Sequence, residues 1–154
     1  MWNRIKTQAE ADVFMESIWG FHDSCIKEMA YVSGAYVDDT LAMYPINDQR
    51  ALRVLFQRQF EDLSVIELLF TGLSCIRMIP NKEEYTCEIL DATLLVQEGR
   101  VCWCDEGGLS TEDMTTNEGT VICAEKVFWR PVEGHKGEAP FYLPADGGGD
   151  DTFD

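Results

Sequence analysis

The spacing of apolar residues changes once along this chain, and that change constrains the fold more than any other feature of the sequence. Near the N-terminus, Ala11, Phe14, Met15 and Ile18 recur at i, i+3, i+4 and i+7, which is the spacing of one face of a helix. Beyond Asp23, apolar residues alternate with a period of two, which is typical of β-strands. The sequence therefore predicts one helix followed by a long series of strands.

Local signals bound the predicted helix at both ends. Thr7 and Glu10 have the spacing of a capping box, a hydroxyl followed three residues later by a carboxylate. Gly20 can end the helix in the left-handed conformation. We therefore expect a helix over residues 7–19.

Strand-like runs separated by turn residues fill the chain from residue 24 to residue 132. Their expected ranges are 24–37, 40–46, 50–60, 64–70, 73–79, 85–96, 100–105 and 120–132. The third and fourth runs are predicted to pair as a hairpin, and the sixth and seventh to pair around Glu98–Gly99. The last run alternates without interruption and is expected to be one strand, with Val121 and Val127 on the same face.

Three places are expected to depart from regular strand. Gly72 predicts a bulge or bend, and a change of apolar face predicts a bulge near Leu90. Residues 105–119 are polar and are expected to form a loop.

One helix followed by strands with short connections predicts an α+β fold. We expect an N-terminal helix packed on a mainly antiparallel sheet that is either strongly curved or closed into a partly open β-barrel. Residues 1–133 are expected to form a single α+β domain. Residues 134–154, which include Gly147–Gly149 and Asp150–Asp151, have little periodicity and are expected to form an acidic, largely flexible C-terminal tail.

The charge balance limits the kinds of partner that the protein can bind. The formal net charge is -16, from 28 acidic and 12 basic residues. Such a field repels nucleic acid and anionic lipid, so we expect neither nucleic acid nor a membrane as a partner. It attracts a basic protein partner, although many acidic proteins owe their charge to solubility alone.

Cysteine spacing and the N-terminal residues predict the location. The six cysteines are irregularly spaced, which favours reduced, buried thiols over a disulfide framework. The first residues are too polar for a signal peptide, and no apolar run is long enough to span a bilayer. We therefore expect a cytoplasmic protein.

His22 and Asp23 are the first candidate site. A histidine beside a carboxylate can ligate a metal or act as a general base. Neighbours along a strand point to opposite faces, so the two side chains converge only where the backbone turns. The structural alternative is that Asp23 or Ser24 caps a turn and His22 packs at the seam between helix and sheet.

Acidic residues between residues 105 and 119 are the second candidate site. Asp105, Glu106, Glu112 and Asp113 occur there without a lysine or arginine. Their spacing does not match a calcium loop, so the two alternatives are a solvated loop and an acidic contact surface.

Cys102-Trp103-Cys104 is the third candidate site. On a strand its two thiols point the same way, and Cys87 or Cys123 could face them. Structural zinc sites usually space their cysteines by two to four residues around a turn, so the sequence favours no metal site. No cofactor is predicted either, and the absence of a phosphate loop, nucleophile elbow or HExxH motif argues against an enzyme.

The segment Trp19-Gly20-Phe21-His22-Asp23-Ser24-Cys25-Ile26 resembles the opening of a group of small, functionally uncharacterised bacterial proteins in which a W-x-F-H-D-S/A segment precedes a run of strands. Arg53-Val54-Leu55-Phe56 and Val65-Ile66-Glu67-Leu68 look like the central hairpin of that group. The segment is also distantly similar to immunity proteins of bacterial polymorphic-toxin systems. The resemblance covers about residues 15–100 and supplies no catalytic residues.

These observations support two hypotheses of function. The first is a non-enzymatic binding protein, of the kind that inhibits a cationic bacterial toxin, with its acidic side chains set against the toxin. The alternative is a small-ligand-binding or catalytic β-barrel with His22 and Asp23 at its mouth.

Overall fold

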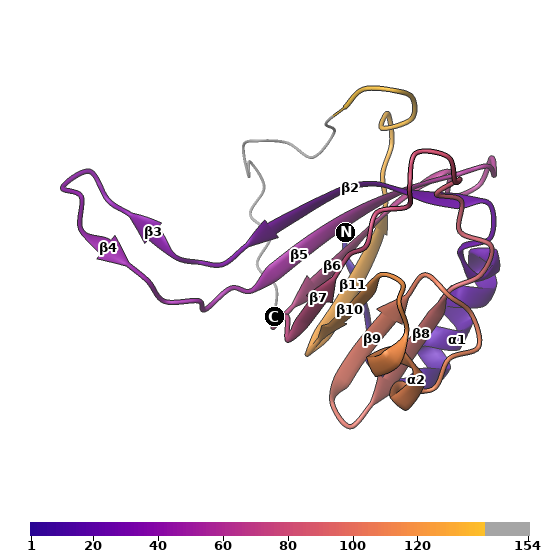
Figure 1. The fold of residues 1–154 in the computed structure, drawn as a ribbon, viewed down its shortest axis with the longest axis horizontal. Coiled ribbons are helices and arrows are strands. Elements are labelled where there is room, and N and C mark those ends of the chain that lie inside the picture. Colours follow the sequence, from indigo (N-terminus) through magenta and orange to yellow (C-terminus); the bar gives the residue numbers. More distant parts are fainter. Residues whose placement is uncertain (141–154) are drawn as a thin grey trace.

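The computed structural model describes residues 1–140, and within them it confirms an α+β fold of mostly antiparallel strands with two α-helices (Figure 1). The N-terminal elements are β1 (Asn3–Ile5), α1 (Gln8–Ser17) and a single 3-10 turn, η1 (Trp19–Phe21). Seven strands follow: β2 (Ser24–Val32), β3 (Tyr36–Val37), β4 (Met43–Tyr44), β5 (Ala51–Arg58), β6 (Val65–Thr71), β7 (Cys75–Arg77) and β8 (Thr93–Gln97). The described part ends with β9 (Arg100–Cys104), α2 (Thr111–Thr116), β10 (Val121–Ala124) and β11 (Lys126–Pro131).

The strands form two main sheets and one small hairpin. The larger sheet has five strands in the order β1-β11-β6-β5-β2, and the smaller has four in the order β7-β10-β9-β8. The strands β3 and β4 form a separate two-stranded sheet. The sheets are not closed into a barrel, so the barrel alternative was wrong. Strong curvature of a sheet stays a prediction.

Two long stretches of chain pass together from one sheet into the other. Strands β6 and β7 follow each other across Gly72, and β10 and β11 follow each other across Glu125. The stretches pair with each other on both sides of this bend. Gly72 has a φ of +65°, and a Cβ there would lie 2.8 Å from the Glu125 Cγ atom, so glycine permits the close approach. The predicted bend at Gly72 is confirmed, whereas the single strand over 120–132 was wrong.

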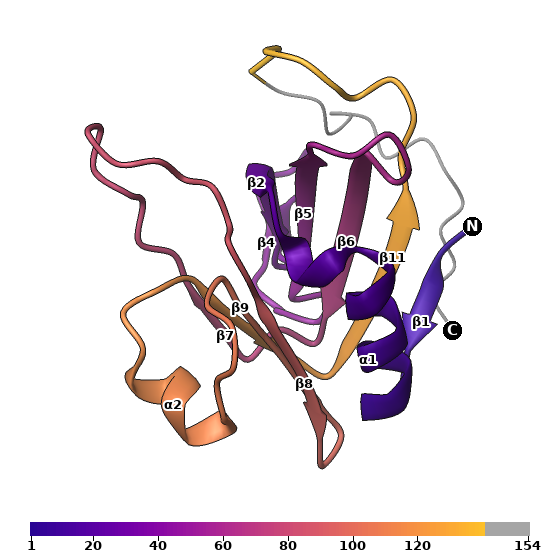
Figure 2. The same cartoon turned by 90° about the vertical axis from the view of Figure 1, so that its right-hand side faces the viewer.

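The main core lies between the two sheets and α1 (Figure 2). Trp103, Phe21 and Phe56 are fully buried, and their rings pack edge-on or tilted against one another at centroid distances of 4.7–5.6 Å. Helix α1 buries Ala11 and Phe14 in the same core. A second, smaller cluster lies on the opposite face of the four-stranded sheet, where Met114 of α2 packs against Cys102, Cys104 and Val121.

Where turn chemistry was clear, the local predictions were right. The hairpins β5–β6 and β8–β9 are both present, and the second turns at Glu98 and Gly99, whose φ values are +51° and +74°. Thr7 caps α1 by accepting a hydrogen bond from the Glu10 amide, while the Glu10 carboxylate accepts one from the Lys6 amide.

Three segments differ from their predictions. Of the predicted strand 85–96, only residues 93–96 join a sheet, and Ile89 forms only an isolated bridge with Ser24. The predicted loop at 105–119 contains the helix α2. The strand β1, which was not predicted, pairs along the edge of β11.

Residues 33–49 form an arm that projects from the body of the molecule beyond the ends of β2 and β5 (Figure 1). The strands β3 and β4 pair within the arm, and the Tyr36 and Tyr44 rings stack at 4.7 Å. Of the predicted strand 24–37, residues 24–32 join the five-stranded sheet and residues 36–37 pair within the arm. Of the predicted strand 40–46, only residues 43–44 are strand, and they also pair within the arm. The base is closed by hydrogen bonds from the Gln49 and Arg50 amides to the Ser33 carbonyl.

The predicted C-terminal tail is described only in its first residues. His135 and Gly137 accept hydrogen bonds from the Gln57 side chain through their carbonyl oxygens. The remainder of the predicted tail, residues 141–154, lies outside the described residues. None of the helices within residues 1–140 has the length and apolar character needed to span a bilayer.

Candidate functional site

The segment between α1 and β2 has an unusual backbone. Trp19, Phe21 and Asp23 have φ values of +54°, +65° and +53°, and Gly20 between them has +60°. Bulky side chains rarely occupy this left-handed region, and each such residue costs on the order of 1–3 kcal/mol. The surrounding structure must therefore hold this segment in place.

Three hydrogen bonds from two other segments hold it. The Ala92 amide donates to the Gly20 carbonyl at 2.9 Å, and the Gln59 amide donates to the Asp23 carbonyl at 3.0 Å. An Arg58 Nη2 group donates to the Ile18 carbonyl, also at 2.9 Å. The left-handed turn is thus fixed against β5 and against the chain that leads into β8.

This turn brings the His22 and Asp23 side chains together, which neighbouring residues on a regular strand could not do. His22 Nε2 lies 3.4 Å from Asp23 Oδ1, and His22 Nδ1 lies 2.8 Å from the Leu90 carbonyl oxygen. A carbonyl oxygen only accepts hydrogen bonds, so Nδ1 carries a proton. The hydrogen bond to Leu90 and the charge of Asp23 together raise the pKa of His22. The ring is exposed rather than packed at the seam between helix and sheet, so the structural alternative was wrong for His22.

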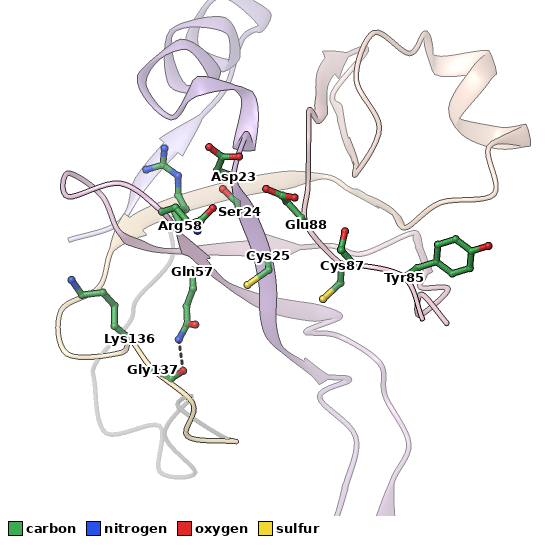
Figure 3. Close-up of a pocket in the computed structure, with 12 residues that line it drawn as sticks. Asp23, Ser24, Cys25, Gln57, Arg58, Tyr85, Cys87, Glu88, Lys136 and Gly137 are labelled. Atoms are coloured by element: carbon green, nitrogen blue, oxygen red, sulfur yellow. Dashed lines mark hydrogen bonds between the residues drawn. The ribbon is translucent and has the colours of Figure 1, made fainter. Parts of the chain in front are cut away.

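Asp23, but not His22, lines a cavity of about 670 Å³ (Figure 3). The walls come from the start of β2, the end of β5, residues 85–88 and residues 136–137. Cys25, Cys87 and Tyr85 are among the lining side chains. The cavity is large enough for a small organic molecule.

The cavity lining includes the thiol of Cys25. Burial, and secondarily the neighbouring Cys87, raises the pKa of the Cys25 thiol, which therefore stays protonated at neutral pH. Among its lining residues there is no histidine to act as a base. The Arg58 guanidinium donates to the carbonyl groups of Asp62, Leu63 and Ile18, so it is already engaged in holding the fold.

Two of the four predicted acidic residues accept hydrogen bonds from backbone amides. Asp113 is the third residue of α2, and its carboxylate accepts hydrogen bonds from the Ser110 amide and hydroxyl. These bonds lower the pKa of Asp113. Asp105 accepts a hydrogen bond from the Thr120 amide at 2.9 Å, and partial burial raises its pKa.

The other two acidic residues are exposed on the same part of the surface. The Glu106 carboxylate accepts a hydrogen bond from the Asn117 side chain, and Glu112 lies in the first turn of α2. The four acidic residues thus lie between β9 and β10 in the sequence, whereas His22 and Asp23 directly precede β2.

The cysteines differ in part from the prediction. Cys102 and Cys123 lie opposite each other in the β9–β10 pair and form a disulfide, so the expectation that every thiol is reduced was wrong at this pair. Cys104 remains a buried free thiol. Within residues 1–140, no group of three or more histidine, cysteine, aspartate or glutamate side chains is arranged to hold a metal ion.

The arm is a surface feature that the sequence analysis missed. Its exposed large apolar side chains are Tyr36, Val37, Leu41, Met43, Tyr44 and Ile46. Leu41 at the tip is 84% exposed, and Met43 is 69% exposed. The sequence did contain a signal for the arm. The turn at Asp38-Asp39-Thr40 joins two apolar runs that are each too short to cross a sheet, which is the pattern of a small separate hairpin.

Within residues 1–140, acidic side chains outnumber basic ones by a larger ratio on the surface than in the whole sequence. Among the 12 basic side chains, those exposed are Arg4, Lys6, Lys82, Arg100 and Lys136. Most acidic side chains within residues 1–140 are exposed. Several arginines instead point inward, because they bond carbonyl groups or the buried Glu67 carboxylate.

No protein-family model matches the sequence, and no match is found among curated proteins or solved structures. The resemblance to small bacterial proteins and to immunity proteins therefore stays a prediction. The function has to be argued from the geometry and charge of this chain.

Proposed function

We propose that this protein is a non-enzymatic binding protein for a basic protein partner, in the manner of an immunity protein that inhibits a cationic bacterial toxin. The observation that carries this proposal is the sign of the exposed charge. Several arginine side chains bond groups of the fold, whereas most carboxylates within residues 1–140 are exposed. An unbalanced surface field of this kind accelerates the encounter with a partner of opposite charge.

The chemistry around the cavity supports binding over catalysis. Cys25 is held as a neutral thiol. His22 is the histidine nearest to Cys25 in the sequence. It donates a hydrogen bond to a backbone carbonyl group and is not among the residues that line the cavity. The Cys25 thiol therefore has no imidazole base among the residues that line the cavity.

A binding titration tests the proposal. The basic proteins encoded next to the gene for this chain would each be purified and titrated calorimetrically, at about 50 mM and about 500 mM salt. We expect one of them to bind, with an affinity that falls steeply as the added salt screens the charges. If none of these basic proteins binds at the lower salt concentration, the proposal is wrong.

A second candidate function is the binding of a small ligand, and the cavity of about 670 Å³ with Asp23 in its wall favours it. Screening a library of small organic molecules by thermal shift would test this function. A stabilising compound should lose its effect when Gln57, which lines the cavity, is replaced by a bulky residue. Stabilisation that survives this change would place the ligand elsewhere.

A further inference from the structure

The arm, residues 33–49, differs from the rest of the surface in carrying apolar side chains on both faces. In an antiparallel pair, residues opposite each other share a face. Tyr36 is opposite Tyr44, and Val37 is opposite Met43, so each face of the arm presents one of these pairs. All four side chains are exposed. Within residues 1–140, no sheet or helix of the body covers either face (Figure 1).

The arm nevertheless has a defined conformation. The Asp38 carboxylate accepts hydrogen bonds from the Thr40 amide and hydroxyl and from the Ala42 amide, which closes the turn at the tip. At the base, the Tyr31 hydroxyl donates to the Asn47 side chain. A two-stranded ribbon that exposes apolar side chains on both faces gains little from burial. Its side chains therefore remain available for contact with another molecule.

The arm is also purely acidic. Asp38, Asp39 and Asp48 are its charged residues, and residues 33–49 contain no lysine or arginine. Hydrogen bonds from Thr40 and Ala42 lower the pKa of Asp38, so this carboxylate stays ionised. A second copy of this chain, with its own net charge of -16, would be repelled by this arm. Complementarity of charge favours a basic partner instead.

We propose that the arm is the docking element of this protein, and that it inserts into an apolar cleft with lysine and arginine side chains at its rim on a basic protein. The inference deepens the proposed function and depends on it, because it identifies which surface meets the basic partner. Two apolar faces require a cleft with two walls rather than a flat patch. The cleft is open at its far end, so that the tip carboxylates of Asp38 and Asp39 reach the lysine and arginine side chains at the rim there.

Uncharged substitutions at the tip test this docking without altering the electrostatic attraction. The variant Leu41→Ser with Met43→Ser removes two exposed apolar side chains of the arm and keeps the net charge. The matched control is Ile76→Ser with Met78→Ser, which removes two apolar side chains that are 44% and 47% exposed in and just after β7. Neither pair belongs to the hydrophobic cores, so both variants are expected to unfold at the wild-type temperature.

The wild type and both variants would be immobilised, and a lysate of the source organism passed over each at about 50 mM salt. Bound proteins would be identified by mass spectrometry, and the most enriched basic protein purified and titrated calorimetrically against all three. We expect the arm variant to raise the dissociation constant of that protein by about 30-fold or more, as for loss of an interface hot spot, and the control to change it by less than about twofold.

The other outcomes separate the two proposals. A basic protein that binds the arm variant as tightly as the wild type would overturn the docking by the arm and leave the proposed function standing. Failure of the wild type to capture any basic protein would overturn both. Self-association that ultracentrifugation detects in the wild type but not in the arm variant would assign the arm to a second copy and overturn this inference.

Discussion

Replacement of Glu67 by glutamine is expected to destabilise the protein strongly, because Glu67 is a buried carboxylate held between two arginines. Its side chain is only 2% exposed and accepts hydrogen bonds from Arg53 Nε at 2.6 Å and from Arg130 Nε at 2.7 Å. The three residues lie on the neighbouring strands β5, β6 and β11. The Arg130 guanidinium also lies 4.2 Å from the centre of the Trp2 ring.

The magnitude follows from burial and from the number of partners. Removing one member of a buried ion pair typically costs about 3–5 kcal/mol. The side chains of Arg53 and Arg130 are 23% and 28% exposed, so both can turn partly toward water, and we expect about 3 kcal/mol for Glu67→Gln. For a chain of this length each kcal/mol lowers the midpoint of thermal unfolding by about 2–4 °C, so the midpoint should fall by about 6–12 °C.

Thermal and urea unfolding, followed by circular dichroism, would measure this loss against a matched control. Glu125→Gln removes an ion pair to Arg50 at 3.1 Å whose side chains are 63% and 37% exposed, and it should cost less than about 1 kcal/mol. Replacing Arg53, Glu67 and Arg130 together by apolar residues should be far less harmful than Glu67→Gln, because no buried charge then lacks a partner. Equal costs for Glu67→Gln and Glu125→Gln would refute the reasoning.

Three further substitutions are expected to give smaller or pH-dependent effects. The raised pKa of His22 means that its contacts stabilise the fold below about pH 6.5, the ordinary histidine value, and that this stabilisation is lost as the pH rises through the raised value. The difference in unfolding midpoint between wild type and His22→Gln should therefore be larger at pH 5 than at pH 8. The pKa of Asp105 is raised mainly by burial, so its ionisation opposes folding, and stability is lost as the pH rises from its unfolded pKa through its folded one. Asp105→Asn should abolish that loss in urea titrations across this range, and an unchanged pH profile would contradict it. Thr7→Ala removes the cap of α1 and should cost about 1 kcal/mol in urea unfolding, whereas a value near zero would show that packing alone fixes the start of the helix.

The sequence predicted those elements that local chemistry determines. Helix α1 has both its cap and its apolar stripe within residues 7–18. The β8–β9 hairpin turns at Glu98 and Gly99, where glycine accepts the positive φ. Neither element needs information from distant parts of the chain.

The passage of strands between the two sheets could not be predicted from the alternation of side chains. Apolar residues alternate on both sides of Glu125, so the pattern is that of one strand. In the structure Val121 belongs to the cluster under α2, whereas Val127 belongs to the main core. The break depends on the contact between Glu125 and Gly72, which are far apart in sequence.

The arm could not be predicted for a related reason. An alternating apolar run indicates a strand that some other surface covers, and within residues 1–140 no surface of this chain covers the arm. Tyr36 and Met43 therefore fit the pattern of a sheet but are exposed. The arm thus has the apolar alternation of a covered strand but exposed side chains, and this difference is the reason for proposing it as a contact surface.

The candidate site was predicted in part, because it depends on backbone conformation. His22 and Asp23 converge as required for a pair, but only because Asp23 and the residues before His22 adopt left-handed φ values. Ser110 and Asp113 have the spacing of a capping box, a signal that the sequence contained but that the acidic composition of the segment obscured. Asp113 therefore bonds the start of α2 as well as contributing charge to the surface.

The placement of arginine connects the stability of the fold with the choice of partner. Neither helix has a basic residue in its last turn, although a cation is favourable at the C-terminal end of a helix. Strand residues supply it instead: Arg58 bonds the Ile18 carbonyl at the end of α1, and Arg77 bonds the Met114 carbonyl near the end of α2. These cations keep their charge, but they face the helix ends and are not among the exposed side chains. The same interactions that hold the helices to the sheets thus contribute to an acidic exterior, on which the proposed binding of a basic partner depends.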